Sequence, residues 1–227
     1  MARTLDLEAH SLRRDAFIDV AQRLIQTKGY EQSSIQDVLD ELGASKGAFY
    51  HYFDSKSVLL EAVIEQMTDA ALAVMAPIVD DPDLPGLGKL QAIFTTLAQW
   101  KGERKQFVIE LLRVWMSDDN TVVREHFRRS VTTRITPLLT TIVRQGAAEG
   151  TFSVSSPEGA ASVLVALLQG ASEGATQLFL ARQANAVSLD DVRSSLASYA
   201  EAYERILGLP AGSWLMLDEA TLHLWFQ

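Results

Sequence analysis

Apolar residues recur at helical spacing along nearly the whole chain, and this period constrains the fold more than any other feature. In the first segment they follow an i, i+3, i+4, i+7, i+8 pattern, which puts them on one face of a helix: Phe17, Val20, Ala21, Leu24 and Ile25. Similar stripes return within residues 35–42, 49–53 and 59–67. No segment alternates polar and apolar residues convincingly, as a half-buried strand would. The sequence therefore predicts an all-α protein.

Turn-forming residues divide this helical pattern into two parts and a tail. Gly29, Gly43 and Asp54 end the first three segments, and residues 80–86 (DDPDLPG) form a loop. Longer helices are expected over 87–101, 103–116, 119–149, 157–184 and 188–207, with Asp118 or Asp119 as a cap and a kink at Pro137. We predict an N-terminal three-helix domain over 1–54, a larger helical domain over 55–210, and a docked apolar tail over 211–227.

Composition excludes several classes of protein. The 227-residue chain has no cysteine, so disulfides, thiolate metal sites and cysteine nucleophiles are impossible. Its longest nearly pure apolar stretch, 160–168, is about half a membrane span, and the N-terminus lacks the apolar core of a signal peptide. The four histidines are not spaced for a metal, and no phosphate-binding loop or nucleophile elbow occurs. The expectation is a cytoplasmic protein without membrane partner, cofactor or enzymatic activity.

Residues 34–53 have the layout of a helix-turn-helix. Gly43 permits the turn, and Ser45 can cap the following helix. Along that helix Ala48, Phe49, Tyr52 and Phe53 point toward a core. The opposite face carries groups suited to a DNA groove: Lys46, Gly47, Tyr50 and His51. A pattern of this kind can also be three packed helices with no DNA partner.

The run 45–63 (SKGAFYHYFDSKSVLLEAV) strengthens the DNA-binding interpretation. It resembles the DNA-binding domain of TetR-family transcriptional regulators, and Gly29-Tyr30 matches the end of that family's first helix. The resemblance implies that the third helix enters the major groove, with Ser34 and Lys56 contacting phosphates. The full predicted DNA-binding set is Ser34, Ser45, Lys46, Gly47, Tyr50, His51 and Lys56.

The negative net charge of the chain does not fit the expected DNA binding. The chain carries a formal net charge of -9, and residues 1–56 hold seven basic and nine acidic residues, a net charge of -2. Few phosphates would be neutralised, so we expect modest non-specific affinity and a weak dependence on salt. The alternative is a helical protein that binds a small molecule or a partner without binding an operator.

The larger domain carries signs of a dimer. Small residues spaced four apart, at Ala166, Gly170 and Gly174, let two helix backbones approach closely. In TetR-like proteins the last two long helices form a four-helix dimer interface, which adds Leu178, Leu196, Tyr199 and Tyr203 to the predicted set. The glycines can instead serve packing within one chain.

The preceding helices combine aromatic and polar residues, as small-molecule sites do. The family's ligand pocket lies there, and the predicted contacts are Phe94, Trp100, Phe107, Glu110, Trp115, His126 and Phe127. The effector remains unidentified, although the composition favours a hydrophobic compound. A regulator without such an effector, controlled by a protein bound at the tail, is a further alternative.

These features together predict a dimeric transcriptional regulator, acting as a repressor. Its partners would be a pseudo-palindromic double-stranded DNA operator, a second copy of the chain and a small-molecule effector.

Overall fold

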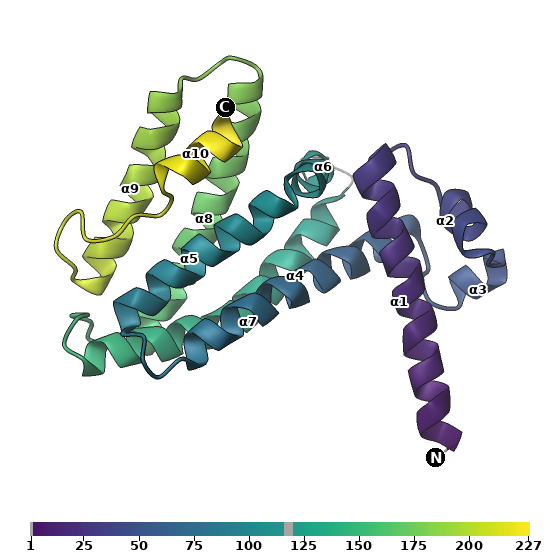
Figure 1. The fold of residues 1–227 in the computed structure, drawn as a ribbon, viewed down its shortest axis with the longest axis horizontal. Coiled ribbons are helices and arrows are strands. Elements are labelled where there is room, and N and C mark those ends of the chain that lie inside the picture. The colour runs from purple at the N-terminus through teal and green to yellow at the C-terminus, as the bar shows by residue number, and fades with distance from the viewer. Residues whose placement is uncertain (1, 116–119) are drawn as a thin grey trace. The chain divides into compact units, whose positions relative to one another are not determined.

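The computed structural model describes residues 2–115 and 120–227, with side chains over 10–114 and 120–227. Within these ranges the chain is entirely helical apart from its turns (Figure 1), as the apolar period predicts. The helices are α1 (Ala2–Lys28), α2 (Ile35–Leu42), α3 (Lys46–Tyr50), α4 (Lys56–Asp80), α5 (Gly86–Glu103), α6 (Lys105–Trp115), α7 (Thr121–Ala148), α8 (Pro157–Gln183), α9 (Leu189–Leu207) and α10 (Glu219–Phe226).

Several helix ends differ from the sequence expectation. Helix α3 ends at Tyr50, and residues 51–53 continue as a turn in which the N–H of Phe53 still donates to the carbonyl of Phe49 (3.0 Å). Helix α10 was not expected at all. The predicted cap at Asp118 or Asp119 lies outside the described residues.

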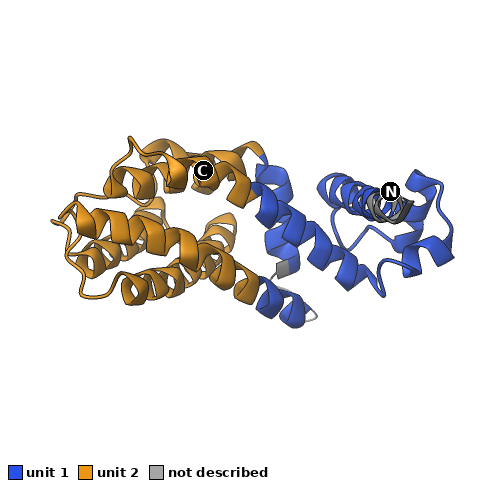
Figure 2. Ribbon diagram, turned by 90° about the horizontal axis from the view of Figure 1, so that it is seen from below, with its two compact units in different colours: residues 1–70, 104–127 blue, residues 71–103, 128–227 orange. Residues whose placement is uncertain are grey.

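The chain divides into two compact units (Figure 2). The first contains residues 1–70 and 104–127, and the second contains 71–103 and 128–227. Helices α4 and α7 each contribute to both units. The domain boundaries proposed from the sequence stay predictions, since a compact unit need not coincide with an independently folding domain.

Aromatic packing organises the first unit. Phe17 of α1, Phe49 of α3 and Phe53 are fully buried. The ring of Phe17 lies 5.8 Å from that of Phe49 and 6.1 Å from that of Phe53. These contacts hold the helix-turn-helix against α1, and each buried ring stabilises the unit by burying apolar area.

The second unit contains the α8/α9 pair and the C-terminal segment 211–227, which we call the tail. Tyr203 of α9 is buried, and its hydroxyl donates to the carbonyl of Leu164 in α8 (2.9 Å). The tail packs onto this pair and α5. Trp214 is 2% exposed, with its ring 4.8 Å from that of Tyr203 and 4.9 Å from that of Phe94.

A buried carboxylate fastens the tail backbone. Glu204 is 4% exposed, and its two oxygens accept hydrogen bonds from the N–H groups of Gly212 (3.1 Å) and Trp214 (2.9 Å). Buried polar groups are costly unless they are paired, so these bonds fix the tail at this point.

Two helices, α4 and α8, are by length and composition apolar enough to cross a membrane. Their most apolar 18-residue windows are only 33% and 28% buried within the chain. The core helices of soluble proteins meet the same criteria, so the expectation of no membrane partner stays a prediction.

The buried indole yields a stability prediction. Trp214→Ala should lower the free energy of unfolding by about 3–5 kcal/mol, because it removes a buried aromatic side chain and leaves a cavity. Leu215→Ala is the matched control, since Leu215 is 62% exposed and should change stability by less than about 0.5 kcal/mol. Chemical denaturation followed by far-ultraviolet circular dichroism measures both, and equal effects would contradict the docked tail.

Candidate nucleic-acid interface

Helix α2 begins with a complete capping box. The hydroxyl of Ser34 accepts a hydrogen bond from the N–H of Asp37 (3.1 Å), and the Asp37 carboxylate accepts one from the N–H of Ser34 (2.7 Å). The Ser34 hydroxyl donates to the same carboxylate (2.5 Å). Both roles of the Ser34 side chain are therefore used locally, which makes it first a cap for α2.

Asp37 also pairs with a lysine of α1. The Lys28 ammonium lies 2.8 Å from the Asp37 carboxylate. This hydrogen bond and those from Ser34 hold the pKa of Asp37 well below its ordinary value. The carboxylate thus stays charged at the start of α2, where the helix dipole favours a negative charge.

Gly43 and Ser45 set the turn between α2 and α3. Gly43 has a φ of 59°, a left-handed conformation that favours glycine. Ser45 then caps α3, its hydroxyl accepting from the N–H of Ala48 (3.2 Å). The turn and cap expected from the sequence are both present.

Helix α3 presents opposite faces to the core and to solvent. Phe49 is buried, whereas Lys46, Gly47, Tyr50 and His51 are exposed. A Cβ on Gly47 would meet only the Ser45 hydroxyl, at 3.9 Å. Packing within the chain therefore does not require glycine here, although glycine costs about 1 kcal/mol in a helix.

Lys56, predicted as a phosphate contact, has a partner within the chain. Its ammonium donates to the carbonyl of Tyr30 (2.6 Å) and lies 4.0 Å from the centre of the Tyr30 ring. Burial lowers the pKa of the amine. In this structure Lys56 joins the start of α4 to the α1–α2 turn.

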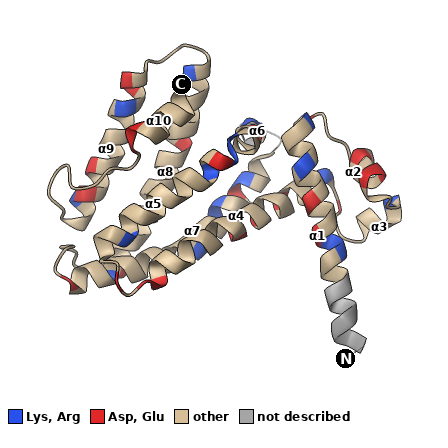
Figure 3. Ribbon diagram, viewed as in Figure 1, with Lys and Arg blue, Asp and Glu red and all other residues tan. Residues whose placement is uncertain are grey.

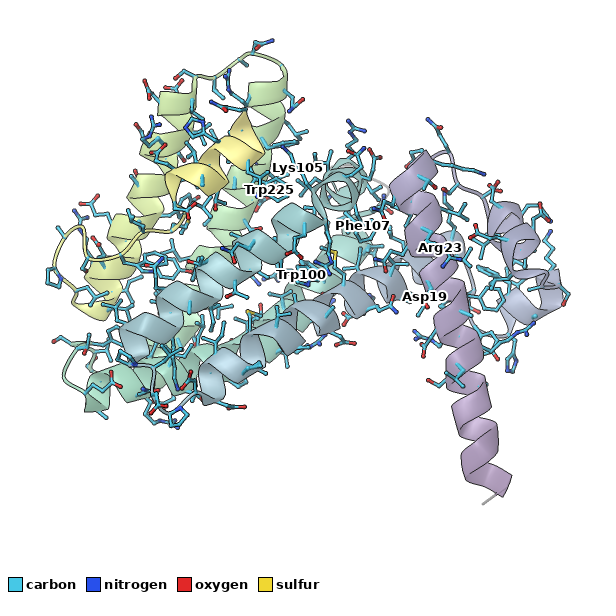
Figure 4. All side chains as sticks on the ribbon, viewed as in Figure 1. Asp19, Arg23, Trp100, Lys105, Phe107 and Trp225 are labelled. Carbon is cyan, nitrogen blue, oxygen red and sulfur yellow. The ribbon has the colours of Figure 1, made fainter. Side chains whose placement is uncertain are left out.

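Helix α1 carries both basic and acidic residues, whereas α2 carries only acidic ones and α3 only a basic one (Figure 3). Arg23 bonds Glu41 (2.8 Å), and Arg14 lies 5.4 Å from the ring of Phe53. Arg23 is labelled on α1 in Figure 4, together with Asp19, which accepts from Gln66 of α4 (3.0 Å). Within the described residues, Lys46 is an exposed cation without an ion-pair partner.

The sequence interpretation missed His10. Its ring lies 5.4 Å from that of His51 and 4.7 Å from that of Tyr52, so α1 reaches the end of α3 here. The contact spans some forty residues, and no local pattern in the sequence signals it.

The predicted ligand contacts fall in both units. Phe94 and Trp100 of α5 belong to the second unit, whereas Phe107, Glu110, His126 and Phe127 belong to the first; Figure 4 labels Trp100 and Phe107 on their helices. The Trp115 side chain lies outside the described residues.

Most of these ligand residues have partners within the chain. Phe94 packs on Trp214, Phe107 is 2% exposed in the aromatic core, and His126 lies 3.5 Å from Glu61. Glu110 bonds Arg113 (2.5 Å) and lines a groove of about 360 Å³ between α6 and residues 26–32.

The predicted dimer residues differ in how far they are exposed to solvent. Ala166 and Gly170 are exposed on α8, and a Cβ on Gly170 would meet nothing within 4 Å. A Cβ on Gly174 would lie 3.1 Å from the Tyr199 hydroxyl, which donates to the carbonyl of Gly170 (3.1 Å). Gly174 and Tyr199 thus lie close together within one chain, and their part in a dimer interface stays a prediction.

Three further members of the predicted dimer set are covered to different degrees. Leu196 and Tyr203 are buried within the chain, and their part in a dimer interface stays a prediction. Leu178 is half-buried.

Comparison with known proteins agrees with this geometry. The family model described as "Bacterial regulatory proteins, tetR family" matches residues 17–63. An uncharacterized HTH-type transcriptional regulator of Lactococcus lactis is 43% identical over 61 residues, which cover 26% of this chain and 31% of the relative. The HTH-type transcriptional repressor KstR2 of Rhodococcus jostii is 27% identical over 131 residues, 53% of this chain and 64% of the relative. The chain thus spans a third to two-thirds of the length of these relatives.

Solved structures share the fold over most of the chain. A TetR transcription regulator from Haloarcula marismortui has a TM-score of 0.62 at 19% identity, covering 87% of this chain and 97% of that one. The SmeT–triclosan complex has a TM-score of 0.61 at 17% identity, covering 90% and 95%.

The capping box of α2 yields a second prediction. Ser34→Ala should lower the free energy of unfolding at pH 7 by about 1 kcal/mol, since it removes the cap. The low pKa of Asp37 stabilises the fold above the ordinary aspartate pKa, and this contribution disappears as the pH falls through the folded-state pKa. The difference between wild type and Ser34→Ala should therefore narrow in acid. Urea titrations at pH 7 and at stepwise lower pH values down to about pH 2 measure it, with Gln36→Ala on the same helix as the control, and a difference that does not narrow at the lowest pH would contradict the charge contribution.

Proposed function

Because the chain belongs to the TetR family of transcriptional regulators, we propose that it represses transcription by binding a pseudo-palindromic operator as a homodimer. A small hydrophobic effector would release it. The observation that carries this proposal is the exposed face of α3, where Lys46, Gly47, Tyr50 and His51 lie opposite the buried Phe49.

The α3 face offers the chemistry that a DNA groove requires. Lys46 supplies an ammonium for a guanine edge or a phosphate, and Tyr50 and His51 supply a hydroxyl and a ring nitrogen. Gly47 lets the backbone come close to the DNA, which would account for a helical glycine that internal packing does not require. Ser34 and Ser45 stand at the starts of α2 and α3, where backbone N–H groups can contact phosphates.

A dimer would supply the specificity that one short helix lacks. Helix α3 has five residues and can contact only a few base pairs, so two copies in successive half-sites are needed for a useful operator. On α8, Val163, Ala166 and Gly170 form an exposed stripe of small and apolar residues. This stripe and the limited burial of α8 support an interface there.

The effector proposal rests on more general grounds. SmeT, whose fold this chain shares, binds triclosan in its complex. The predicted contacts on α5–α7 are rich in aromatic rings, which suits a hydrophobic compound. The effector would act by binding a conformer that fits the operator poorly, with a coupling free energy of about 1–3 kcal/mol. A DNA-bound repressor of this kind would work in the cytoplasm.

One alternative has a specific observation in its favour. The net charge of -2 in residues 1–56 would suit a helical binding protein that does not bind an operator. The exposed Lys46, which has no ion-pair partner among the residues that the structure describes, argues for the DNA-binding function. The following experiment separates the two.

Selection of duplexes from a random DNA pool tests operator binding directly. We expect a palindrome to be enriched, and Lys46→Ala to weaken its binding without loss of helical content. The slope of log affinity against log salt should fall by about 0.9 for each phosphate that the variant no longer neutralises. Lys105→Ala, on α6, is a control for the general effect of removing a lysine. A folded wild-type protein that enriches no duplex at low salt would favour the alternative.

The proposed interface yields a prediction for α8. Ala166→Glu should raise the dimer dissociation constant more than about tenfold, because it places two carboxylates near the symmetry axis of a dry interface. The monomer should be unaffected, since Ala166 is exposed. Sedimentation velocity measures the effect, with Ala73→Glu at an exposed position of α4 as the control. An unchanged dimer would exclude this face of α8.

A further inference from the structure

The exposed surface of α3 continues onto α1 at His10. The centre of the His10 ring lies 5.4 Å from that of His51 and 4.7 Å from that of Tyr52, and the rings of His51 and Tyr52 are 4.9 Å apart. His10 and His51 are both exposed. Two imidazoles from distant parts of the sequence therefore lie side by side at the end of the helix that we propose to enter the DNA groove.

This part of α1 lies outside the core of the first unit. The side chains of residues 10–14 are exposed, and complete burial on α1 begins at Phe17. Figure 1 shows that α1 runs past α2 and α3 toward its N-terminal end. Arg14 lies 5.4 Å from the centre of an aromatic ring of the core. Arg13, one turn after His10, is exposed and has no ion-pair partner among the residues that the structure describes.

The spacing of the two histidines brings His10 within reach of DNA. The major groove is about 12 Å wide. A ring 5.4 Å from His51 therefore lies over the groove or its flanking phosphates when α3 enters it. Imidazole nitrogens bond phosphates or base edges, and a guanidinium matches the oxygens of a phosphate. The side chains of His10 and Arg13 thus offer the chemistry that this place requires.

We propose that His10 contacts operator DNA beside His51 and that Arg13 contacts an adjacent phosphate, so that the DNA-binding surface extends from α3 onto α1. The inference rests on the proposed operator binding. Neither residue belongs to the helix-turn-helix, so each half-site is longer than α3 alone contacts. Arg13 also supplies a positive charge for phosphate in a unit whose residues 1–56 carry a net charge of -2.

A pair of substitutions at His10 separates DNA contact from ring packing. His10→Phe keeps the ring contacts with His51 and Tyr52 and removes both ring nitrogens. On a duplex selected by the wild-type protein, His10→Phe and His10→Ala should each weaken binding about tenfold, with Tm unchanged. Leu12→Ala is the control and should bind as the wild type does, since Leu12 is 72% exposed on the same helix. Wild-type affinity of His10→Phe would overturn the proposal, because ring packing alone would then explain the contact.

Two arginines of α1 form a matched pair for the phosphate contact. Arg13→Gln should reduce the slope of log affinity against log salt by about 0.9 per protomer. Arg23→Gln should leave the slope unchanged, since Arg23 bonds Glu41 within the unit (2.8 Å). Equal slopes for Arg13→Gln and the wild type would overturn this part of the proposal.

Chemical modification of histidines tests the contact on the wild-type protein. Operator DNA should protect His10 and His51 from diethyl pyrocarbonate and leave the exposed His223 of α10 unprotected, as mass spectrometry of the peptides measures. An unprotected His10 would overturn the proposal. The failure of operator binding itself is distinguishable, because the wild-type protein would then bind no selected duplex and both proposals would fall together.

Discussion

The burial of Phe49 is the interaction on which the helix-turn-helix of the first unit depends. Helix α3 has five residues, and a helix this short is not stable alone in water. It persists because Phe49 and the following Phe53 are fully buried against Phe17 of α1. The helical period then fixes the opposite face, so Lys46 and Tyr50 are exposed as a consequence of packing. Packing thus leaves the opposite face of this short helix available for the proposed contacts with DNA.

Local signals made much of the fold predictable from the sequence. The expected ranges 35–42, 157–184 and 188–207 agree closely with α2, α8 and α9, because the serines that precede these helices supply caps whose geometry needs only neighbouring residues. Helix α10 was missed, although Asp218 caps it as the serines cap the other helices. The docking of the tail, in which Glu204 and Tyr203 meet Trp214, was not predictable in detail. Neither partner has a sequence signal that points to the other.

The same distinction applies to the candidate site. The exposed face of α3 followed from period and motif, whereas the partner of Lys56 did not, since Tyr30 lies 26 residues away. A motif specifies which residue type stands at a position but not which group its side chain contacts. Leu196 and Tyr203 illustrate this limit for the dimer set, because their apolar stripe is satisfied by α8 of the same chain. Only the solvent exposure of each residue in the structure distinguishes them from Ala166 and Gly170.

The pairing of basic side chains within the chain determines what the proposed operator binding can rely on. Three cations of α1–α4 have partners within the unit: Lys28 with Asp37, Arg23 with Glu41 and Lys56 with Tyr30. Non-specific affinity, which depends on phosphate neutralisation, should therefore be low. In the proposed operator complex, specific binding would come from the shape and hydrogen bonds of α3 in two half-sites at a fixed spacing. A DNA-binding domain of this kind would depend strongly on its own geometry, because few phosphate contacts would hold a misaligned domain on the DNA. In the proposed regulation, a small change in this geometry could therefore release an operator that a more basic domain would retain.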